Sequence, residues 1–225
     1  MLKESGAKTD AVLAWTDLWP MHVPLPKHGW TEQLPAGVSV LVDETGEETP
    51  YWTALLSGHA QPGRGTVYCN GLCSQADRAA YQQQVYWHNP RSDMLAREMS
   101  VQQWLREAVL RWPHWNDTAW SQHSEGFGLS EHLSKPLWHL STGCLRKLGI
   151  ATALASEAPL TVIEEPVAAL DAQSIHYLCQ ALDALGDAVA ESEHGPRWVL
   201  VTHWEPLPGV TWDEVLAAPA LLART

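Results

Sequence analysis

Residues Leu140–Asp171 read LSTGCLRKLGIATALASEAPLTVIEEPVAALD, and this stretch decides the fold. It opens with a turn of small residues in which Ser141 and Gly143 stand where a helix would begin. The N–H groups of a first helical turn have no intrahelical acceptor, so they and the serine hydroxyl are well placed to face an anion. The apolar positions of Leu145–Ala155 then predict one helix with a buried face.

The second half of the stretch predicts a buried strand with acids at its end. Leu160–Ile163 is a short apolar run, typical of a strand covered on both faces of a parallel sheet. Glu164 and Glu165 follow it, then a proline, and Asp171 comes shortly afterwards. Acids at the carboxyl end of a strand in an open α/β sheet lie where such folds place their chemistry. The order therefore indicates an α/β fold with part of a phosphate-handling site.

Four motifs in order make this region resemble the nucleotide-binding domain of an ATP-binding cassette (ABC) ATPase. The signature LSGGQ is matched by Leu140, Ser141, Thr142, Gly143 and Cys144, with Thr and Cys as departures. Walker B is matched by Leu160–Pro166, with Glu164 in place of aspartate. The D-loop is matched by Ala169–Asp171 and the switch histidine by Val201–His203. The resemblance implies a P-loop NTPase-like core with a mostly parallel sheet, an N-terminal antiparallel β part and a small helical subdomain.

The same resemblance assigns roles to single residues. In the family they would be a catalytic base (Glu165), a Mg-supporting acid (Glu164), a γ-phosphate contact (His203), a D-loop contact across a dimer (Asp171), and signature groups that act on the partner subunit's nucleotide (Ser141, Gly143). We expect both signature residues to face outward on a turn. The alternative is that all six are relics that only hold strand ends and helix starts in place.

The phosphate loop is where the sequence departs from the family. Alignment back from Gly58 lays Asp43–Pro50, DETGEETP, over G-x-x-x-x-G-K-[ST]. In this alignment Asp43 and Glu48 replace the two glycines, Thr49 replaces the lysine and Pro50 replaces the Mg-binding hydroxyl residue. Only Gly46 remains. A working loop needs glycines for the approach of N–H groups to phosphates, and a lysine to neutralise charge.

Four carboxylates in this loop, those of Asp43, Glu44, Glu47 and Glu48, oppose a phosphate. Each repels a phosphate charge about 5 Å away by roughly 3 kcal/mol at an effective dielectric of about 20. Loss of the lysine removes about 1.5–3 kcal/mol more. We therefore expect no ATP at this loop. Thr49 as N-cap and Pro50 as first helical residue predict an ordinary helix start that is satisfied within the chain.

Composition favours one domain, residues 1–225. The resemblance implies that its core lies in 1–88 and 139–225 and its helical subdomain in 89–138. A formal charge of −12 argues against nucleic acid as a partner. No apolar run approaches the roughly 20 residues of a membrane span, so we expect a cytoplasmic protein, held at the inner face of a membrane only through a permease. The four cysteines favour reduced thiols, with a metal site through Cys69 and Cys73 as the alternative.

Outside these motifs the pattern predicts a strand at 38–42, a helix at 54–58, a hairpin around Asn70-Gly71, a capped helix at 101–109 and a helix at 175–185. It also predicts a first strand at 11–15, loop at 19–34 and a terminal helix at 213–224. The family's switch glutamine falls near His88 and is lost. Tryptophan is abundant, with 13 residues. Trp15, Trp19 and Trp30 are candidates to stack on adenine, and Trp104, Trp112, Trp115 and Trp120 to dock a partner; the alternative for all seven is packing.

Three functions stay open. The first is a non-catalytic ABC subunit that pairs, as a dimer, with a competent ATPase or a permease and completes the partner's site, with Mg-ATP bound only through that partner. The second is an active ABC ATPase with an unusual loop. The third is a pseudo-ATPase scaffold.

Overall fold

The computed structural model describes residues 12–24, 26–89, 98–190 and 195–221. Its centre is a five-stranded sheet in the order β6-β7-β8-β3-β9, in which every strand pair is parallel. The strands are β3 (Gly37–Val42), β6 (Val85–His88), β7 (Leu160–Glu164), β8 (Trp198–His203) and β9 (Glu214–Ala217). An all-parallel sheet is buried on both faces, and β7 and β8 are buried along their whole lengths.

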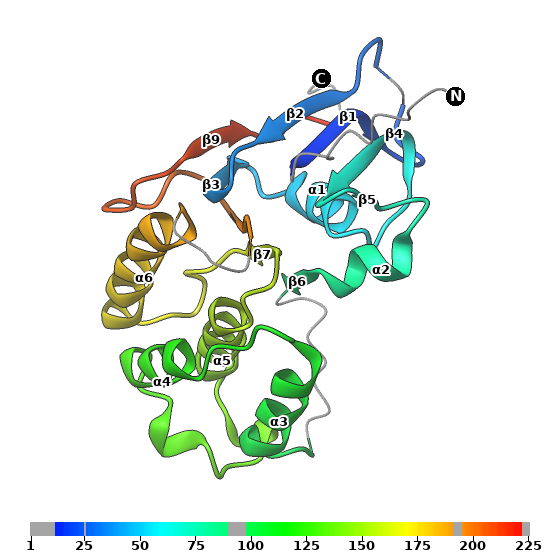
Figure 1. Ribbon diagram of the computed structural model, residues 1–225. Helices are drawn as coiled ribbons and strands as arrows, with labels where there is room; N and C mark the ends of the chain where they lie inside the picture. Colours follow the sequence, from blue (N-terminus) through cyan, green and yellow to red (C-terminus); the bar gives the residue numbers. More distant parts are fainter. Residues whose placement is uncertain (1–11, 25, 90–97, 191–194, 222–225) are drawn as a thin grey trace.

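A second sheet is antiparallel and lies at the end of the molecule opposite α3 and α4 (Figure 1). Its strand order is β2-β1-β4-β5, and its strands are β1 (Leu13–Pro20), β2 (Trp30–Leu34), β4 (Pro62–Cys69) and β5 (Leu72–Cys73). Asn70 and Gly71 have φ of 49° and 78°, which is the conformation of the tight hairpin turn predicted there.

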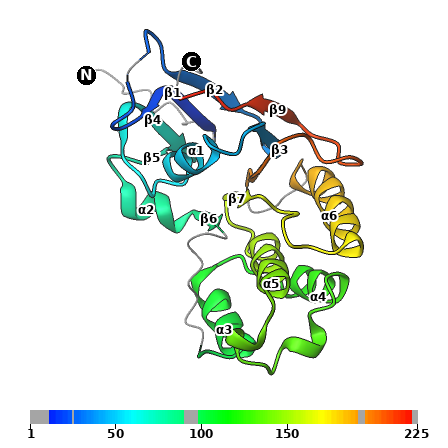
Figure 2. The ribbon, with the colours of Figure 1, turned by 180° about the vertical axis from the view of Figure 1, so that it is seen from behind.

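The helices complete a layered α/β fold. They are α1 (Thr49–Leu56), α2 (Arg78–Gln83), α3 (Val101–Arg111), α4 (Asp117–Gly126), α5 (Thr142–Ala155) and α6 (Ala172–Ala190), with short 3-10 turns at Ser130–His132 and Leu137–His139. Figures 1 and 2 place α1 between the two sheets, α5 and α6 beyond the parallel sheet, and α3 and α4 at the far end. The predicted fold class, a mostly parallel core with an antiparallel β part and a group of helices, is confirmed.

Two hydrophobic cores lie on the two faces of the parallel sheet. Alternate residues of β8 divide between them: Trp198 and Leu200 face the core shared with α1 and the antiparallel sheet, while Val199 and Val201 face α5 and α6. This division follows from the two-residue period of a strand. The sheet is therefore fixed from both sides, which holds the loops at its carboxyl ends in place.

The predicted loop at 19–34 is wrong at both ends, because β1 continues to Pro20 and β2 begins at Trp30. Packing explains the difference. Trp15, Trp19 and Trp30 are at most 8% exposed, and Trp30 sits with its ring centroid 4.6 Å from that of Trp15 and 4.9 Å from that of Trp52. Edge-to-face aromatic pairs of this kind stabilise a core. The three tryptophans therefore pack, and the adenine-stacking alternative finds no support.

The predicted terminal helix at 213–224 is also wrong. Residues 214–217 form β9, the edge strand that pairs in parallel with β3. Asp213 accepts a hydrogen bond from the Val38 N–H at 2.7 Å and donates its own N–H to the Val38 carbonyl at 2.9 Å. An unpaired edge of β3 provides these partners, which helical periodicity cannot reveal. Residues 222–224 of the predicted helix lie outside the described part.

The helix α3 begins at the predicted residue and continues two residues beyond the predicted end. Ser100 and Gln103 form the predicted capping box, and the helix ends at Arg111, before Pro113. On this helix Val101 is buried, whereas Val109 is 43% exposed. Of the tryptophans considered for docking, Trp112 is buried and the other three, Trp104, Trp115 and Trp120, are half-buried. Within the described ranges, no helix has both the length and the apolar character that a bilayer crossing requires.

Candidate functional site

A cleft of about 300 Å³ opens at the carboxyl ends of β3, β7 and β8. It collects residues from three loops, namely Asp43, Glu44, Thr45, Gly46, Thr49, Glu165, Val167, Ala168, Thr202, His203 and Trp204. Backbone hydrogen bonds join the loops, from the Asp43 N–H to the His203 carbonyl at 3.0 Å and from the Glu165 N–H to the Thr202 carbonyl at 3.2 Å. The parallel register thus brings together the predicted phosphate loop, the acid after β7 and the histidine that ends β8.

Asp43 occupies the centre of the phosphate loop with its own carboxylate. One oxygen, Oδ2, accepts from the Glu48 N–H at 3.0 Å, the Thr49 N–H at 2.8 Å and the Thr49 hydroxyl at 2.9 Å. The other, Oδ1, accepts from the N–H and the hydroxyl of Thr45 at 3.1 and 2.9 Å. The N–H groups that begin α1 therefore already face an anion, and that anion belongs to the protein.

The charge of Asp43 suits this role. Burial raises the pKa of its carboxyl, but hydrogen bonds from Thr49 and Thr45 outweigh it and lower the pKa to about 2. The predicted helix start needs a correction, because Glu48 is the N-cap residue, Thr49 is the first helical residue and Pro50 follows it. Thr49 does not cap α1 with its side chain, since its hydroxyl donates to Asp43.

The other loop residues support the same arrangement. Glu48 is buried and its carboxylate accepts from the Thr45 hydroxyl at 2.7 Å, which links the loop across one turn. Gly46 has a φ of 69°, a conformation that L-residues with side chains adopt at a cost. It is the one residue of the phosphate-loop pattern that remains, and a turn explains its presence.

Glu164, the predicted Mg-supporting acid, is fully buried at 1% exposure. It accepts hydrogen bonds from the Thr53 hydroxyl and, at 2.8 Å, from the Trp87 indole N–H. It is not one of the described residues that line the cleft. Its carboxylate therefore ties β7 to α1 and β6.

Glu165 and His203 do line the cleft, as the resemblance implies for a base and a phosphate contact. Glu165 has a φ of 44°, and its carbonyl accepts from the Arg146 guanidinium at 2.9 Å. His203 is 6% exposed and its Nδ1 lies 2.8 Å from the Glu205 carbonyl. The geometry brings both side chains to one cavity, opposite the acidic loop.

The signature residues stand at the start of α5, as predicted. Ser141 is exposed, is the N-cap residue and accepts from the Cys144 N–H at 3.1 Å. Gly143 needs a correction, because it does not face outward freely. A Cβ there would lie 2.5 Å from the Ala169 carbonyl oxygen of the D-loop, so only glycine allows this contact between signature and D-loop.

Asp171 has a structural role that sequence reasoning did not find. Its carboxylate pairs with the Lys147 ammonium at 2.6 Å and accepts from the N–H and hydroxyl of Ser174 in the first turn of α6. The hydrogen bond from Lys147 and those from Ser174 hold its pKa well below the usual range. Asp171 therefore joins α5 to the start of α6 and keeps the D-loop between them.

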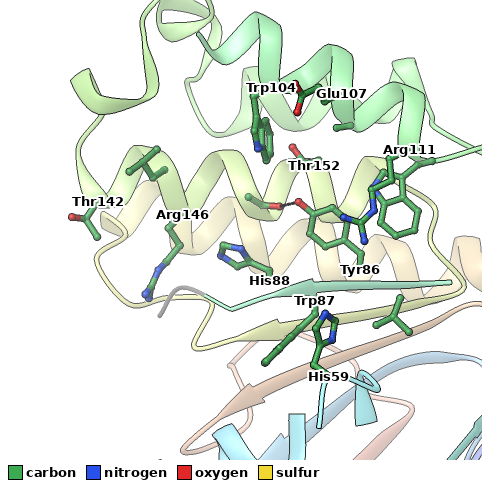
Figure 3. Close-up of a pocket in the computed structure, with 15 residues that line it drawn as sticks. His59, Tyr86, Trp87, His88, Trp104, Glu107, Arg111, Thr142, Arg146 and Thr152 are labelled. Carbon is green, nitrogen blue, oxygen red and sulfur yellow. Dashed lines mark hydrogen bonds between the residues drawn. The ribbon is translucent and has the colours of Figure 1, made fainter. Parts of the chain in front are cut away.

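A second cleft, of about 420 Å³, separates β6 from α3 and α5 (Figure 3). In Figure 3, Trp104 points from α3 towards α5, and His88 rises from β6 towards the same helix. The cleft carries charged residues that sequence reasoning missed, Glu107, Arg111 and Arg146. The helical spacing of Trp104, Glu107 and Arg111 was the available signal, since positions three and seven apart share a face.

His88 stands where the switch glutamine was expected and is buried at the end of β6. A Cβ on Gly149 of α5 would lie 2.4 Å from its ring, so the imidazole packs on that glycine. Cys69 and Cys73 are free and buried. Across the described ranges, no group of three or more His, Cys, Asp or Glu side chains could hold a metal ion, so the cysteine metal site finds no support.

The fold and the loop positions define a class, the ATP-binding cassette proteins. The structure resembles an ABC transporter ATP-binding protein from Pyrococcus furiosus, with a TM-score of 0.73 and 18% identity over 92% of this chain and 98% of that one. It also resembles a dimeric ATP-binding cassette in a post-hydrolysis state bound to ADP and phosphate, with a TM-score of 0.65 and 14% identity over 85% and 88% of the two chains. At these identities the likeness shows the fold alone.

Sequence similarity defines the family more closely. No family model matches the chain. The cytochrome c biogenesis ATP-binding export protein CcmA of Pseudomonas fluorescens is 30% identical over 152 residues, which cover 66% of this chain and 67% of that protein. The CcmA of Paramagnetospirillum magneticum is 29% identical over 170 residues, covering 70% and 75%. The chain belongs to the ABC ATP-binding protein family that includes CcmA.

Proposed function

We propose that this chain is a non-catalytic ABC ATP-binding subunit that binds no nucleotide at its own phosphate loop and pairs with a competent ATPase or a permease. One observation carries the proposal, the Asp43 carboxylate that accepts hydrogen bonds from the Glu48 and Thr49 N–H groups. A nucleotide phosphate would need those N–H groups. It would also have to displace an ionised, hydrogen-bonded carboxylate without the help of a lysine.

The other half of the site supports a role in a partner's chemistry. The exposed Ser141 stands at the start of α5, and Gly143 holds that helix start against the D-loop. In an ABC dimer these groups act on the nucleotide of the opposite subunit, so the loss of the chain's own loop leaves them useful. We propose a dimer in which Mg-ATP lies between this signature and the partner's phosphate loop.

The names of the relatives suggest the setting of that complex. CcmA proteins are named as ATP-binding export proteins of cytochrome c biogenesis. We propose that this chain acts on the cytoplasmic side of a membrane, held there by a permease. The cleft between α3 and α5, with its half-buried Trp104 and the charged Glu107 and Arg111, suits a partner segment that offers both apolar and charged groups.

Calorimetry with Mg-ATP tests the absence of nucleotide at the phosphate loop. We expect no binding in the micromolar range, and no phosphate release by the purified chain. A dissociation constant below about 100 μM, or roughly −5.5 kcal/mol, would refute the proposal and favour an active enzyme.

The trans role needs the complex purified from its source. Ser141→Ala should slow the partner's ATPase by at least about tenfold, because a charge-assisted hydrogen bond contributes about 1.5–3 kcal/mol. Ser130→Ala, in the nearby 3-10 turn, is the matched control and should leave the rate unchanged. If Ser141→Ala binds the partner and the complex keeps its full rate, the scaffold function replaces the trans-active one.

A further inference from the structure

One face of α5 lies against the loop of residues 165–171, which follows β7. Gly143 is so close to this loop that a Cβ there would be 2.5 Å from the Ala169 carbonyl oxygen. The Arg146 guanidinium donates from Nη1 to the Glu165 carbonyl at 2.9 Å. Residues three apart in a helix share a face, so the signature glycine and this arginine meet the loop together.

A third contact lies on the same face. Lys147, four positions after Gly143, pairs through its ammonium with the Asp171 carboxylate at 2.6 Å. The Asp171 side chain is 58% exposed, and an ion pair with an exposed member contributes little. Arg146, by contrast, is 9% exposed, and a buried, charge-assisted hydrogen bond is stronger. Arg146 is therefore the main tie between α5 and the loop.

The conformation of the loop depends on such ties. Glu165 and Ala169 have φ of 44° and 61°. Residues with a side chain adopt this left-handed conformation at a cost, and they keep it only where their surroundings fix it. The Glu165 N–H donates to the Thr202 carbonyl at 3.2 Å, and the Glu165 carbonyl accepts from Arg146 and, at 3.2 Å, from the Ala168 N–H. The backbone of Glu165 is thus held by the end of β8 and by α5.

We propose that Arg146 is a positioning residue that couples the signature to the loop of residues 165–171, so that the start of α5 and this loop move together. It acts through Ser141, the exposed N-cap residue of α5, and does not itself touch a nucleotide. The inference rests on the proposed function only where it concerns the partner's nucleotide. The coupling is a property of this chain alone and is tested on it first.

Native-state hydrogen exchange of the isolated chain tests the coupling. Two amides report on the two sides, that of Ala168 in the loop and that of Leu145, which donates to the Ser141 carbonyl. Arg146→Gln should speed exchange at both amides at least about tenfold, because one charge-assisted hydrogen bond is lost, and should leave the amides of β4 unchanged. No acceleration, acceleration at Ala168 alone, or equal acceleration in β4 would each overturn the coupling.

A second variant reaches the same contact without altering the guanidinium. Gly143→Ala places a Cβ against the Ala169 carbonyl oxygen, although alanine favours a helix more than glycine does. It should speed exchange at Ala168 at least about fivefold. Gly186→Ala in α6 is the matched control, since a Cβ there meets nothing closer than the Asp213 carboxylate at 4.0 Å. Unchanged exchange at Ala168 in Gly143→Ala, or equal acceleration in Gly186→Ala, would contradict the proposal.

The role in the partner's reaction is measured on the complex purified from its source. Arg146→Gln should slow the ATPase at least about fivefold, and it should add little in a Ser141→Ala background, because both changes act through one group. Arg78→Gln is the matched control, an arginine of α2 that also donates to backbone carbonyls, those of Gly58 at 3.1 Å and His59 at 2.7 Å. It should leave the rate unchanged. Independent, multiplying effects of the Arg146 and Ser141 changes would show a merely structural role for Arg146.

The two proposals fail in different ways. If Ser141→Ala slows the ATPase and Arg146→Gln does not, the proposed function stands and the positioning role of Arg146 is refuted. If Ser141→Ala leaves the rate unchanged, the trans role in the proposed function is refuted, and hydrogen exchange in the isolated chain still decides whether Arg146 couples the signature to the loop.

Discussion

At the residue scale, the hydrogen bonds of the Asp43 carboxylate explain the conformation of residues 43–50 better than the absence of a lysine does. The acids in 43–48 suggest repulsion of a phosphate, and the structure shows that one of them accepts hydrogen bonds from the N–H groups at the start of α1. Glu48 supports this carboxylate indirectly through the Thr45 hydroxyl, which lies 2.9 Å from Asp43 Oδ1 and 2.7 Å from Glu48 Oε2 and shares its one proton between the two acids. The loop is therefore a closed hydrogen-bond network with an anion at its centre.

The first prediction concerns that network. Asp43→Asn should lower the free energy of unfolding by roughly 1–3 kcal/mol, because an amide NH₂ would face donors that need an acceptor. Urea denaturation at pH 7 measures it. Glu44→Gln, exposed in the same loop, should change stability by less than about 0.5 kcal/mol. An Asp43→Asn variant as stable as the unmodified chain would show that the network contributes little.

The second prediction is a pH dependence. Burial lowers the pKa of His123 to about 4, with a smaller contribution from the positive charge of Arg197. The unfolded chain therefore binds more protons than the folded chain between about pH 6.5 and pH 4, and stability should fall as the pH falls through that window, by up to about 3 kcal/mol.

Denaturation curves at pH 7, 5.5 and 4.5 measure this loss. His123→Gln should make the curve flatter in the same window. Replacement of the exposed His28 by Gln controls for the loss of an imidazole and should leave the slope unchanged. If His123→Gln and the unmodified chain lose stability in parallel, the depressed pKa is not the cause.

At the element scale, the starts of helices can be predicted from neighbouring residues, whereas the edge strand β9 cannot. A capping box starts α3, and the N-cap serine starts α5, both within four residues of sequence. By contrast β9 is short, mostly exposed and held by a neighbour far away in the chain. Its first contact is the Asp213 carboxylate on the Val38 N–H, 175 positions apart.

The third prediction tests that anchor. Asp213→Ala should speed amide exchange in β9 about fivefold, which corresponds to about 1 kcal/mol for one hydrogen bond, with little effect on β7. Native-state hydrogen exchange resolves the two strands. Glu214→Ala, at the next exposed position, is the control. Unchanged protection in β9 would mean that the ladder to β3 holds the strand without this carboxylate.

At the scale of the whole molecule, one cavity unites loops from the ends of β3, β7 and β8, and α5 carries the signature elsewhere. The loops to which the family resemblance assigns nucleotide handling therefore meet at one edge of the parallel sheet. Glu164 does not line this cavity, because its hydrogen bonds to Thr53 and Trp87 hold it inside the protein.

The fourth prediction follows from this contrast. The combined change Asp43→Gly, Glu48→Gly, Thr49→Lys and Pro50→Ser should give Mg-ATP binding below about 100 μM, since it frees the N–H groups of the loop and supplies a lysine. Hydrolysis should not follow, because the switch glutamine is absent and Glu164 is held away from the cleft. Calorimetry and phosphate release separate the two steps.

The control for this quadruple variant carries Thr49→Met with the other three changes, so that the loop opens without the lysine. The control should bind Mg-ATP more weakly than the quadruple variant. Robust phosphate release by the quadruple variant would contradict the account of Glu164, and failure to bind despite a folded chain would contradict the account of the loop.

The sequence by itself determined the parts of this protein that depend on near neighbours. The helix that follows residue 141 and the acid-ended strand at 160–164 follow from periodicity, and the family resemblance identified the signature turn and the histidine at 203. The departures in 43–50 are also visible there. Each of these features is local, since a cap, a strand period or a charge run acts over a few residues.

Only the tertiary structure decided which anion the loop holds, what Gly143 and Asp171 do, and that the tail is a strand. In each case the deciding partner is distant or depends on the fold. The loop must curve back for its N–H groups to reach the Asp43 carboxylate. Gly143 lies so close to the D-loop that a Cβ there would be 2.5 Å from the Ala169 carbonyl oxygen. Val38 donates to Asp213, which is 175 positions away in the chain. Hydrogen bonds and steric contacts act over a few ångströms, and only folding brings these groups that close.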